Sequence, residues 1–190
     1  MTIRDVKFIK INMMPGLCFQ SQDKELLKDA VVIAEEVTSD FFKLSHWRRS
    51  RYDILTLEAL RQEEISPHAL ALVARYHGLH PGRLLHSASF DFYRVCLQDH
   101  NILEALGRNP GLTLFPLLLY ILTHELVHIV RFSQFQALFE APEWERRREE
   151  DLVHRLTQKI LAPLDYFDLQ PALRFYEISG PPGGWQYAHL

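Results

Sequence analysis

The segment ILTHELVHIV, residues 121–130, places two histidines and a glutamate in the most apolar part of the chain. His124 and His128 are four residues apart, so on an α-helix they lie about 40° apart around the axis and roughly 6 Å apart along it. Both imidazoles can therefore face one ion. Two neutral imidazoles are a typical donor pair for Zn²⁺, and Glu125 is placed to take a proton from a water at the metal. The spacing predicts a zinc centre with Glu125 as its general base.

A structural explanation of the same residues is a core helix whose histidines bond to backbone carbonyls and whose glutamate reaches solvent. The neighbouring residues favour a metal, because they are apolar on nearly every side of the helix and imply burial. They are Leu117, Leu118, Leu119, Ile121, Leu122, Leu126, Val127, Ile129 and Val130. Burying three polar groups without partners costs several kcal/mol, and a metal with its outer partners removes that cost.

A catalytic zinc site needs a third protein ligand and keeps a fourth position open for water. The downstream candidates are Glu140, Glu143, Glu145, Glu149, Glu150, Asp151 and His154. On the helix expected after Pro142, Glu149 falls within the apolar arc and Glu150 lies at its edge, with His154 on the same face as Glu150. Helical periodicity alone does not choose among Glu149, Glu150 and His154.

The motif HELVH followed by EDLVHRLTQKILAP resembles the gluzincin metallopeptidases, and more narrowly the ImmA/IrrE-type peptidases, over residues 114–163. The resemblance implies a zinc metalloendopeptidase in which a glutamate on the next helix is the third ligand. It also implies a short polar residue four positions later that orients the first histidine. Counting back from Pro163 places the ligand on Glu150 and the orienting residue on His154. The family usually has Asp or Asn there, so His154 either supports a ligand histidine or is itself the third ligand of a three-histidine site.

The resemblance also implies how such a site would cleave a peptide. Glu125 would accept a proton from the attacking water and pass it to the leaving amine. A strand upstream of the active helix would line the cleft and pair with an extended peptide, and residues 87–98 occupy that place in the order. Tyr120 and Tyr166 are candidates for the group that stabilises the oxyanion, although a buried tyrosine is more often a core residue with a satisfied hydroxyl.

Periodicity and turn residues predict the elements that position these groups. A strand is expected over residues 6–11, an amphipathic helix over 23–44 with Asp23 as its cap, helical segments over 54–64 and 66–77, and a strand over 87–99. The Asn109-Pro110-Gly111 turn precedes the helix with the histidines, which is expected to start at the N-cap Thr113 and run to about Phe132. A charged helix follows from near Pro142 until Pro163 stops it.

These elements indicate an α+β fold: a helix-dominated, minimal zincin-like domain with a small mixed or antiparallel sheet and two metal-bearing helices. One domain is expected over residues 1–165, with mostly helical support in 1–85 and a strand plus the metal helices in 86–165. Residues 166–190, rich in proline and glycine, are expected to form an irregular tail. Its end, SGPPGGWQYAHL, could be a mobile terminus or an inhibitory tail in the cleft.

The composition of the chain limits its cellular location and the classes of partner that it could bind. The 190 residues carry a formal net charge of −3, which gives no overall attraction to nucleic acid or anionic membranes. Cys18 and Cys96 form no CxxC pair, which argues against a disulfide framework. The N-terminus lacks the apolar centre of a signal peptide, and the longest apolar run, 112–122, is too short to span a bilayer. We therefore expect a cytoplasmic protein without membrane association, and the resemblance to gluzincins implies a peptide or protein substrate.

Two other functions compete with the peptidase. Residues 57–85 faintly resemble a helix-turn-helix, but the second helix would carry only Arg83 as a base, so the electrostatic footprint for DNA is missing. A metal-binding domain without catalysis, acting as a sensor or partner-binding module, fits the same motif. The oligomeric state is left open.

Overall fold

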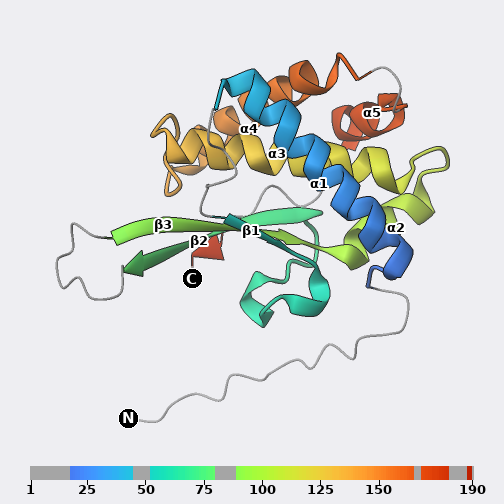
Figure 1. Ribbon diagram of the computed structural model, residues 1–190, viewed down its shortest axis with the longest axis horizontal. Helices are drawn as coiled ribbons and strands as arrows, with labels where there is room; N and C mark the ends of the chain where they lie inside the picture. The colour runs from blue at the N-terminus through green and yellow to red at the C-terminus, as the bar shows by residue number, and fades with distance from the viewer. Residues whose placement is uncertain (1–17, 45–51, 80–88, 165–167, 180–187, 190) are drawn as a thin grey trace, which may run out of the picture.

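The computed structural model describes residues 18–44, 52–79, 89–164, 168–179 and 188–189. In this part of the chain, a layer of helices covers one face of a small mixed sheet (Figure 1). The predicted α+β class is thereby confirmed. The strand expected over residues 6–11 lies outside the described residues.

The sheet has the strand order β1-β3-β2-β4. Its strands are β1 (Tyr52–Leu55), β2 (Ala71–Leu79), β3 (Ser89–Leu97) and the two-residue β4 (Ala188–His189). β3 pairs in parallel with β1 and antiparallel with β2, while β4 pairs in parallel with β2 at Ala74 and Arg75. The strand predicted over 87–99 is confirmed as β3, an inner strand of the sheet.

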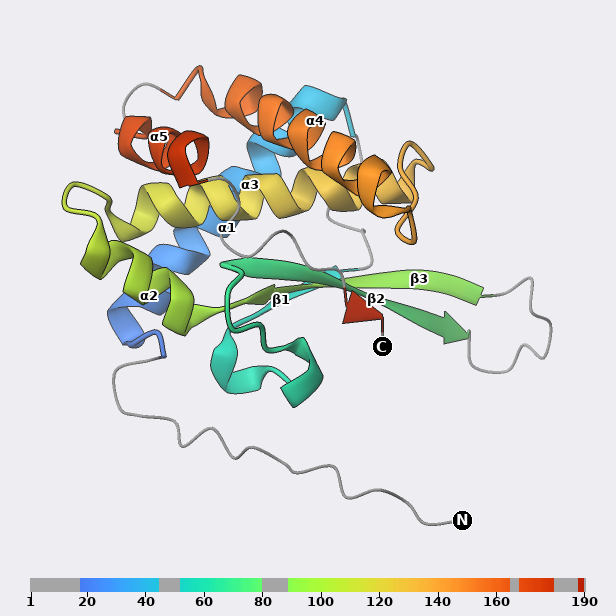
Figure 2. The same cartoon turned by 180° about the vertical axis from the view of Figure 1, so that it is seen from behind.

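The described helices are α1 (Ser21–Phe42), α2 (Asp99–Arg108), α3 (Leu114–Ser133), α4 (Glu143–Leu161) and α5 (Gln170–Ser179). α3 is the central helix: it contacts α1, α2, α4 and α5 on its sides and the sheet below (Figure 2). The predicted helix from Thr113 and the predicted charged helix after Pro142 are confirmed as α3 and α4. Thr113 is the N-cap residue of α3, although its side chain makes no capping hydrogen bond.

α3 is apolar because it forms the middle of the core. It is long and apolar enough to cross a membrane by length and composition, yet most of it is buried within the fold. Leu117, Leu118, Ile121 and Leu122 are fully buried. Their burial explains the apolar run as the core helix of a folded domain, and it makes α3 a rigid support for any polar group on it.

The helical segments predicted over 54–64 and 66–77 are wrong. This part of the chain forms β1, two short 3₁₀ turns (Leu57–Ala59 and Gln62–Glu64) and β2. β2 pairs along its whole length with β3, a contact between segments distant in sequence that local periodicity does not reveal. A helix-turn-helix over 57–85 is therefore excluded for its described part. In the described part of residues 1–85, the expected mostly helical support consists of α1 together with β1 and β2 of the sheet.

The start of α1 and the presence of α5 also differ from the prediction. The N-cap of α1 is Gln20, and Asp23 sits at the third helical position, where its carboxylate accepts a hydrogen bond from the Gln20 N–H at 2.8 Å. This is a capping box with Gln20 in place of serine or threonine. In the expected irregular tail, residues 170–179 form α5, which packs on α3.

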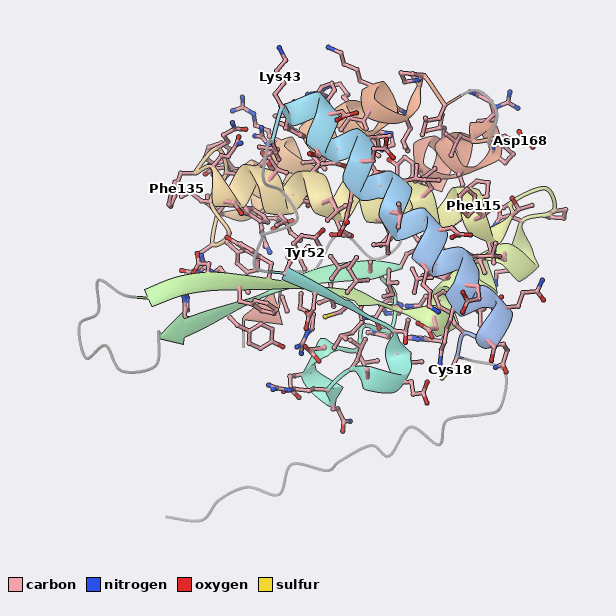
Figure 3. The ribbon with its side chains drawn as sticks, in the orientation of Figure 1. Cys18, Lys43, Tyr52, Phe115, Phe135 and Asp168 are labelled. Carbon is pink, nitrogen blue, oxygen red and sulfur yellow. The ribbon has the colours of Figure 1, made fainter. Side chains whose placement is uncertain are left out.

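The loop between α3 and α4 contains a residue in an unusual conformation. Phe135 has a left-handed φ of 56° and its side chain is 91% exposed, pointing away from the fold beside the C-terminal end of α3 (Figure 3). The chain then turns back, so that α4 runs antiparallel along α3. This return brings the two predicted metal helices together.

Candidate metal centre

α3 presents His124 and His128 on one face, as their four-residue spacing predicts. Both side chains are buried, and their Nε2 atoms lie 3.1 Å apart. Their rings are inclined at 64° with centroids 4.8 Å apart. The two nitrogens therefore converge on one point beside the helix.

α4 adds the carboxylate of Glu150 to this pair. Its Oε2 lies 3.4 Å from the Nε2 of His124 and 3.3 Å from that of His128. Tetrahedral zinc with ligand bonds of about 2.0–2.1 Å requires donor atoms about 3.3–3.4 Å apart, so this triangle fits one face of a zinc tetrahedron. Among the described residues, these three form a group that could hold a metal ion.

Electrostatics favour the metal-binding forms of two of these groups. Burial lowers the pKa of His124 to about 4, which keeps its imidazole neutral at physiological pH. Burial alone would raise the pKa of Glu150, but His128 and hydrogen bonds from both histidines outweigh it and lower the pKa to about 2. Metal ligands must be deprotonated, and a neutral histidine beside an ionised carboxylate meets this requirement.

Glu125 lies beside the triad but does not belong to it. Its side chain is buried, and its Oε1 has no hydrogen-bond partner among the described residues. Burial, reinforced by the negative charge of Glu150, raises its pKa well above the usual value. A buried carboxylate oxygen without a partner is expensive unless the site supplies one, and a water at a bound metal is such a partner. The side chains present therefore fit a bound zinc ion with a water.

The structure places the two alternative third ligands elsewhere. Glu149 forms a two-pronged ion pair with Arg131, in which Nη2 of the arginine lies 2.8 Å from Oε2. Nδ1 of His154 is hydrogen-bonded to the hydroxyl of Tyr120, and its Nε2 lies 3.1 Å from the amide nitrogen of Gln158. Neither side chain joins the group formed with the histidines, so Glu150 is the third member.

The remaining acidic candidates serve other contacts or lie outside the group. Glu140 forms an ion pair with Arg75 of β2, and Glu143 with Arg147 one turn along α4. Glu145 and Asp151 are not members of the candidate metal group either. For the oxyanion donors, the Tyr120 hydroxyl contacts His154, and Tyr166 lies outside the described residues.

Aromatic rings stack on the two histidines of the candidate group, one at each end. Phe132 stacks on His128 with centroids 5.7 Å apart, and Tyr120 stacks on His124 at 6.1 Å. Tyr176 of α5 stacks on Tyr120 in turn at 4.0 Å. Phe132 lies one helical turn from His128 and Tyr120 one turn from His124, a spacing that the sequence already shows. The role of Tyr176 could not be predicted, because α5 was expected to be irregular.

Comparisons with family models, curated proteins and solved structures found no match to this chain.

Proposed function

We propose that the protein is a zinc-dependent metallopeptidase that hydrolyses peptide bonds in a peptide or protein substrate. One observation carries the proposal: His124, His128 and Glu150, from two antiparallel helices, place three donor atoms 3.1–3.4 Å apart beside the buried carboxylate of Glu125. The resemblance to gluzincins, including the ImmA/IrrE-type peptidases, supports the same assignment. The two free cysteines of the protein, Cys18 and Cys96, support a cytoplasmic location.

In this proposal each side chain has a separate task. His124, His128 and Glu150 would hold the zinc ion. A bound zinc ion lowers the pKa of a water to about 7 and polarises a carbonyl. Glu125 takes the proton of the attacking water on its carboxylate and gives it to the leaving amine. Burial raises the pKa of Glu125, which makes its carboxylate a stronger acceptor for the proton of the water.

Zinc binding is expected to stabilise the fold against heat. At a free zinc concentration about a hundredfold above Kd, binding adds about 2.7 kcal/mol to the free energy of unfolding, which raises Tm by roughly 5–10 °C for a chain of this size. Differential scanning calorimetry with and without zinc measures the shift. The double variant His124→Ala/His128→Ala should show none, and an equal shift in this variant would refute the site.

A peptide substrate would run along the outer edge of β2. β3 is paired with β2 along its length and with β1 over residues 93–96, so these four residues have no free edge for the substrate strand that we expected over residues 87–98. β2 is the next strand toward the opposite edge, and Arg75 on it contacts Phe139, which packs against Phe132 beside His128. Strand addition at this edge binds through the backbone and tolerates many sequences.

The two residues of β4, Ala188 and His189, pair with part of that edge at Ala74 and Arg75. If the substrate uses this edge, β4 competes with it. Ala188→Pro removes a strand N–H from β4, and a lost hydrogen bond is worth about 1 kcal/mol, so this variant should have a kcat/KM about fivefold higher. Ala188→Ser keeps the N–H and should behave like the unchanged protein. Equal kcat/KM for all three proteins would mean that substrate binds elsewhere.

The complete burial of His124 and His128 favours a second candidate function, a metal-binding domain that senses metal or binds a partner without catalysis. Such a protein would bind one zinc ion per chain and cleave no member of a fluorogenic peptide library. The peptidase cleaves at least one member, loses this activity on treatment with a chelator and regains it when zinc is added.

A further inference from the structure

Two polar contacts join α3 to α4, one on each side of the candidate metal group. On one side, the hydroxyl of Tyr120 is hydrogen-bonded to Nδ1 of His154. On the other, the guanidinium of Arg131 pairs with both carboxylate oxygens of Glu149. Along α3 the order is Tyr120, the ligand histidines, Arg131, and along α4 the order is reversed. The metal group is therefore bracketed along both helices.

The Tyr120–His154 contact is firmly held. Tyr120 is fully buried and its ring is stacked on Tyr176 of α5. The second ring nitrogen of His154 lies 3.1 Å from the Gln158 amide, one turn further along α4. Tyr120 lies one turn before His124, and His154 one turn after Glu150. A shift of α4 along or about its axis would break this contact together with the position of Glu150.

The Arg131–Glu149 contact limits α4 from the other side. Both side chains are only 12% exposed, and the arginine uses Nε and Nη2 in a planar two-bond arrangement. Charge-assisted pairs with two parallel bonds restrict direction as well as distance. Glu149 immediately precedes Glu150 on α4. When Arg131 of α3 holds the carboxylate of Glu149, the side chain of Glu150 is therefore turned toward the histidines.

We propose that Tyr120–His154 and Arg131–Glu149 are two positioning pairs that set the spacing and rotation of α4, and thereby the affinity of the metal site. The inference rests on the metal binding assigned under the proposed function. The ligands come from different helices, and metal sites tolerate only about 0.2 Å of deviation in ligand distance. Contacts that hold the ligand-bearing elements are therefore expected to control affinity rather than merely add to stability.

The test measures zinc affinity by competition with a chromogenic chelator, alongside the free energy of unfolding of the metal-free protein. Tyr120→Phe and Arg131→Gln should each weaken zinc binding by about tenfold to a hundredfold at an unchanged stoichiometry of one, the range seen when outer partners of ligands are lost. The visible spectrum of bound Co²⁺ should change as well, because it reports ligand geometry. A purely structural role would lower the free energy of unfolding and leave affinity and spectrum unchanged.

Conservative and control variants separate positioning from folding. His154→Asn keeps a polar atom for Tyr120 and should stay within about threefold of the unchanged affinity, whereas His154→Leu should lose about tenfold. Tyr52→Phe removes a tyrosine contact with Glu35 between β1 and α1, and Arg147→Gln removes an ion pair within α4. Both controls should bind zinc normally.

The outcomes distinguish this inference from the proposed function. Normal zinc affinity in Tyr120→Phe and Arg131→Gln, with one zinc in the unchanged protein, would overturn the positioning role and leave the metal site standing. Failure of the unchanged protein to bind zinc would overturn both. Should Arg131→Gln fold poorly, Arg131→Lys keeps the charge but not the two parallel bonds, and it should still weaken zinc binding.

Discussion

Glu125→Gln is expected to lower kcat for peptide cleavage by about 10²–10⁴-fold while one zinc ion stays bound per chain. Glutamine has the shape of glutamate but cannot accept the proton of the attacking water, and general-base catalysis contributes a factor of this size. Glu125 is not part of the donor group formed by His124, His128 and Glu150, so its replacement leaves the ligands in place. Zinc analysis and kinetics on a cleaved fluorogenic peptide, performed on the same sample, measure both effects.

Two comparisons make this result specific. Glu104→Gln removes a carboxylate from the exposed face of α2 and should leave kcat unchanged. Burial raises the pKa of Glu125, so an ionised carboxylate there costs stability above its unfolded-state pKa, and Glu125→Gln should not lower the Tm of the metal-free protein at neutral pH. Unchanged kcat in Glu125→Gln would exclude Glu125 as the base, and loss of zinc would show instead that it supports the metal.

The helices that carry the site could be predicted because their signals are local. α3 has an apolar run after a firm turn, and α4 is a charged helix that begins after Pro142 and ends before Pro163. The structure of residues 54–77 could not be predicted in this way, because it depends on pairing with β3, which is distant in sequence. β2 is a strand through nine residue pairs with β3, and the apolar residues that suggested a helix there serve both faces of a sheet.

In the candidate site, too, one part could be predicted from local spacing and another part depends on how distant segments pack. His124, Glu125 and His128 lie within five residues of one helix, so spacing alone predicts that the two histidines share a face and that Glu125 lies on its flank. The choice of Glu150 over Glu149 depends on how α4 is rotated against α3, and that rotation is tied to a distant residue, Arg131, which pairs with Glu149. The distribution of apolar residues around α4 alone does not show how this helix is rotated against α3. Resemblance to gluzincins led to Glu150, and the structure supplies a physical reason for it.

Glu150→Gln is expected to weaken zinc binding more than a hundredfold, beyond the tenfold to hundredfold loss typical of outer partners. The substitution removes the negative charge and leaves a neutral amide, a poor zinc ligand, opposite His124 and His128. Asp151→Asn makes the same change in charge at the next, exposed position of α4 and should bind zinc normally. Isothermal titration of metal-free protein with zinc, under chelator competition, gives each affinity.

The same titration decides between the two forms of the site that sequence left open. In a three-histidine site, His154→Asn would lose zinc and Glu150→Gln would keep it. The structure predicts the reverse, because both ring nitrogens of His154 contact Tyr120 and Gln158, while Oε2 of Glu150 lies 3.3 Å from His128. Near-normal affinity in Glu150→Gln would therefore refute the assigned ligand set, whatever the activity of the protein, since affinity depends on the donor atoms and not on turnover.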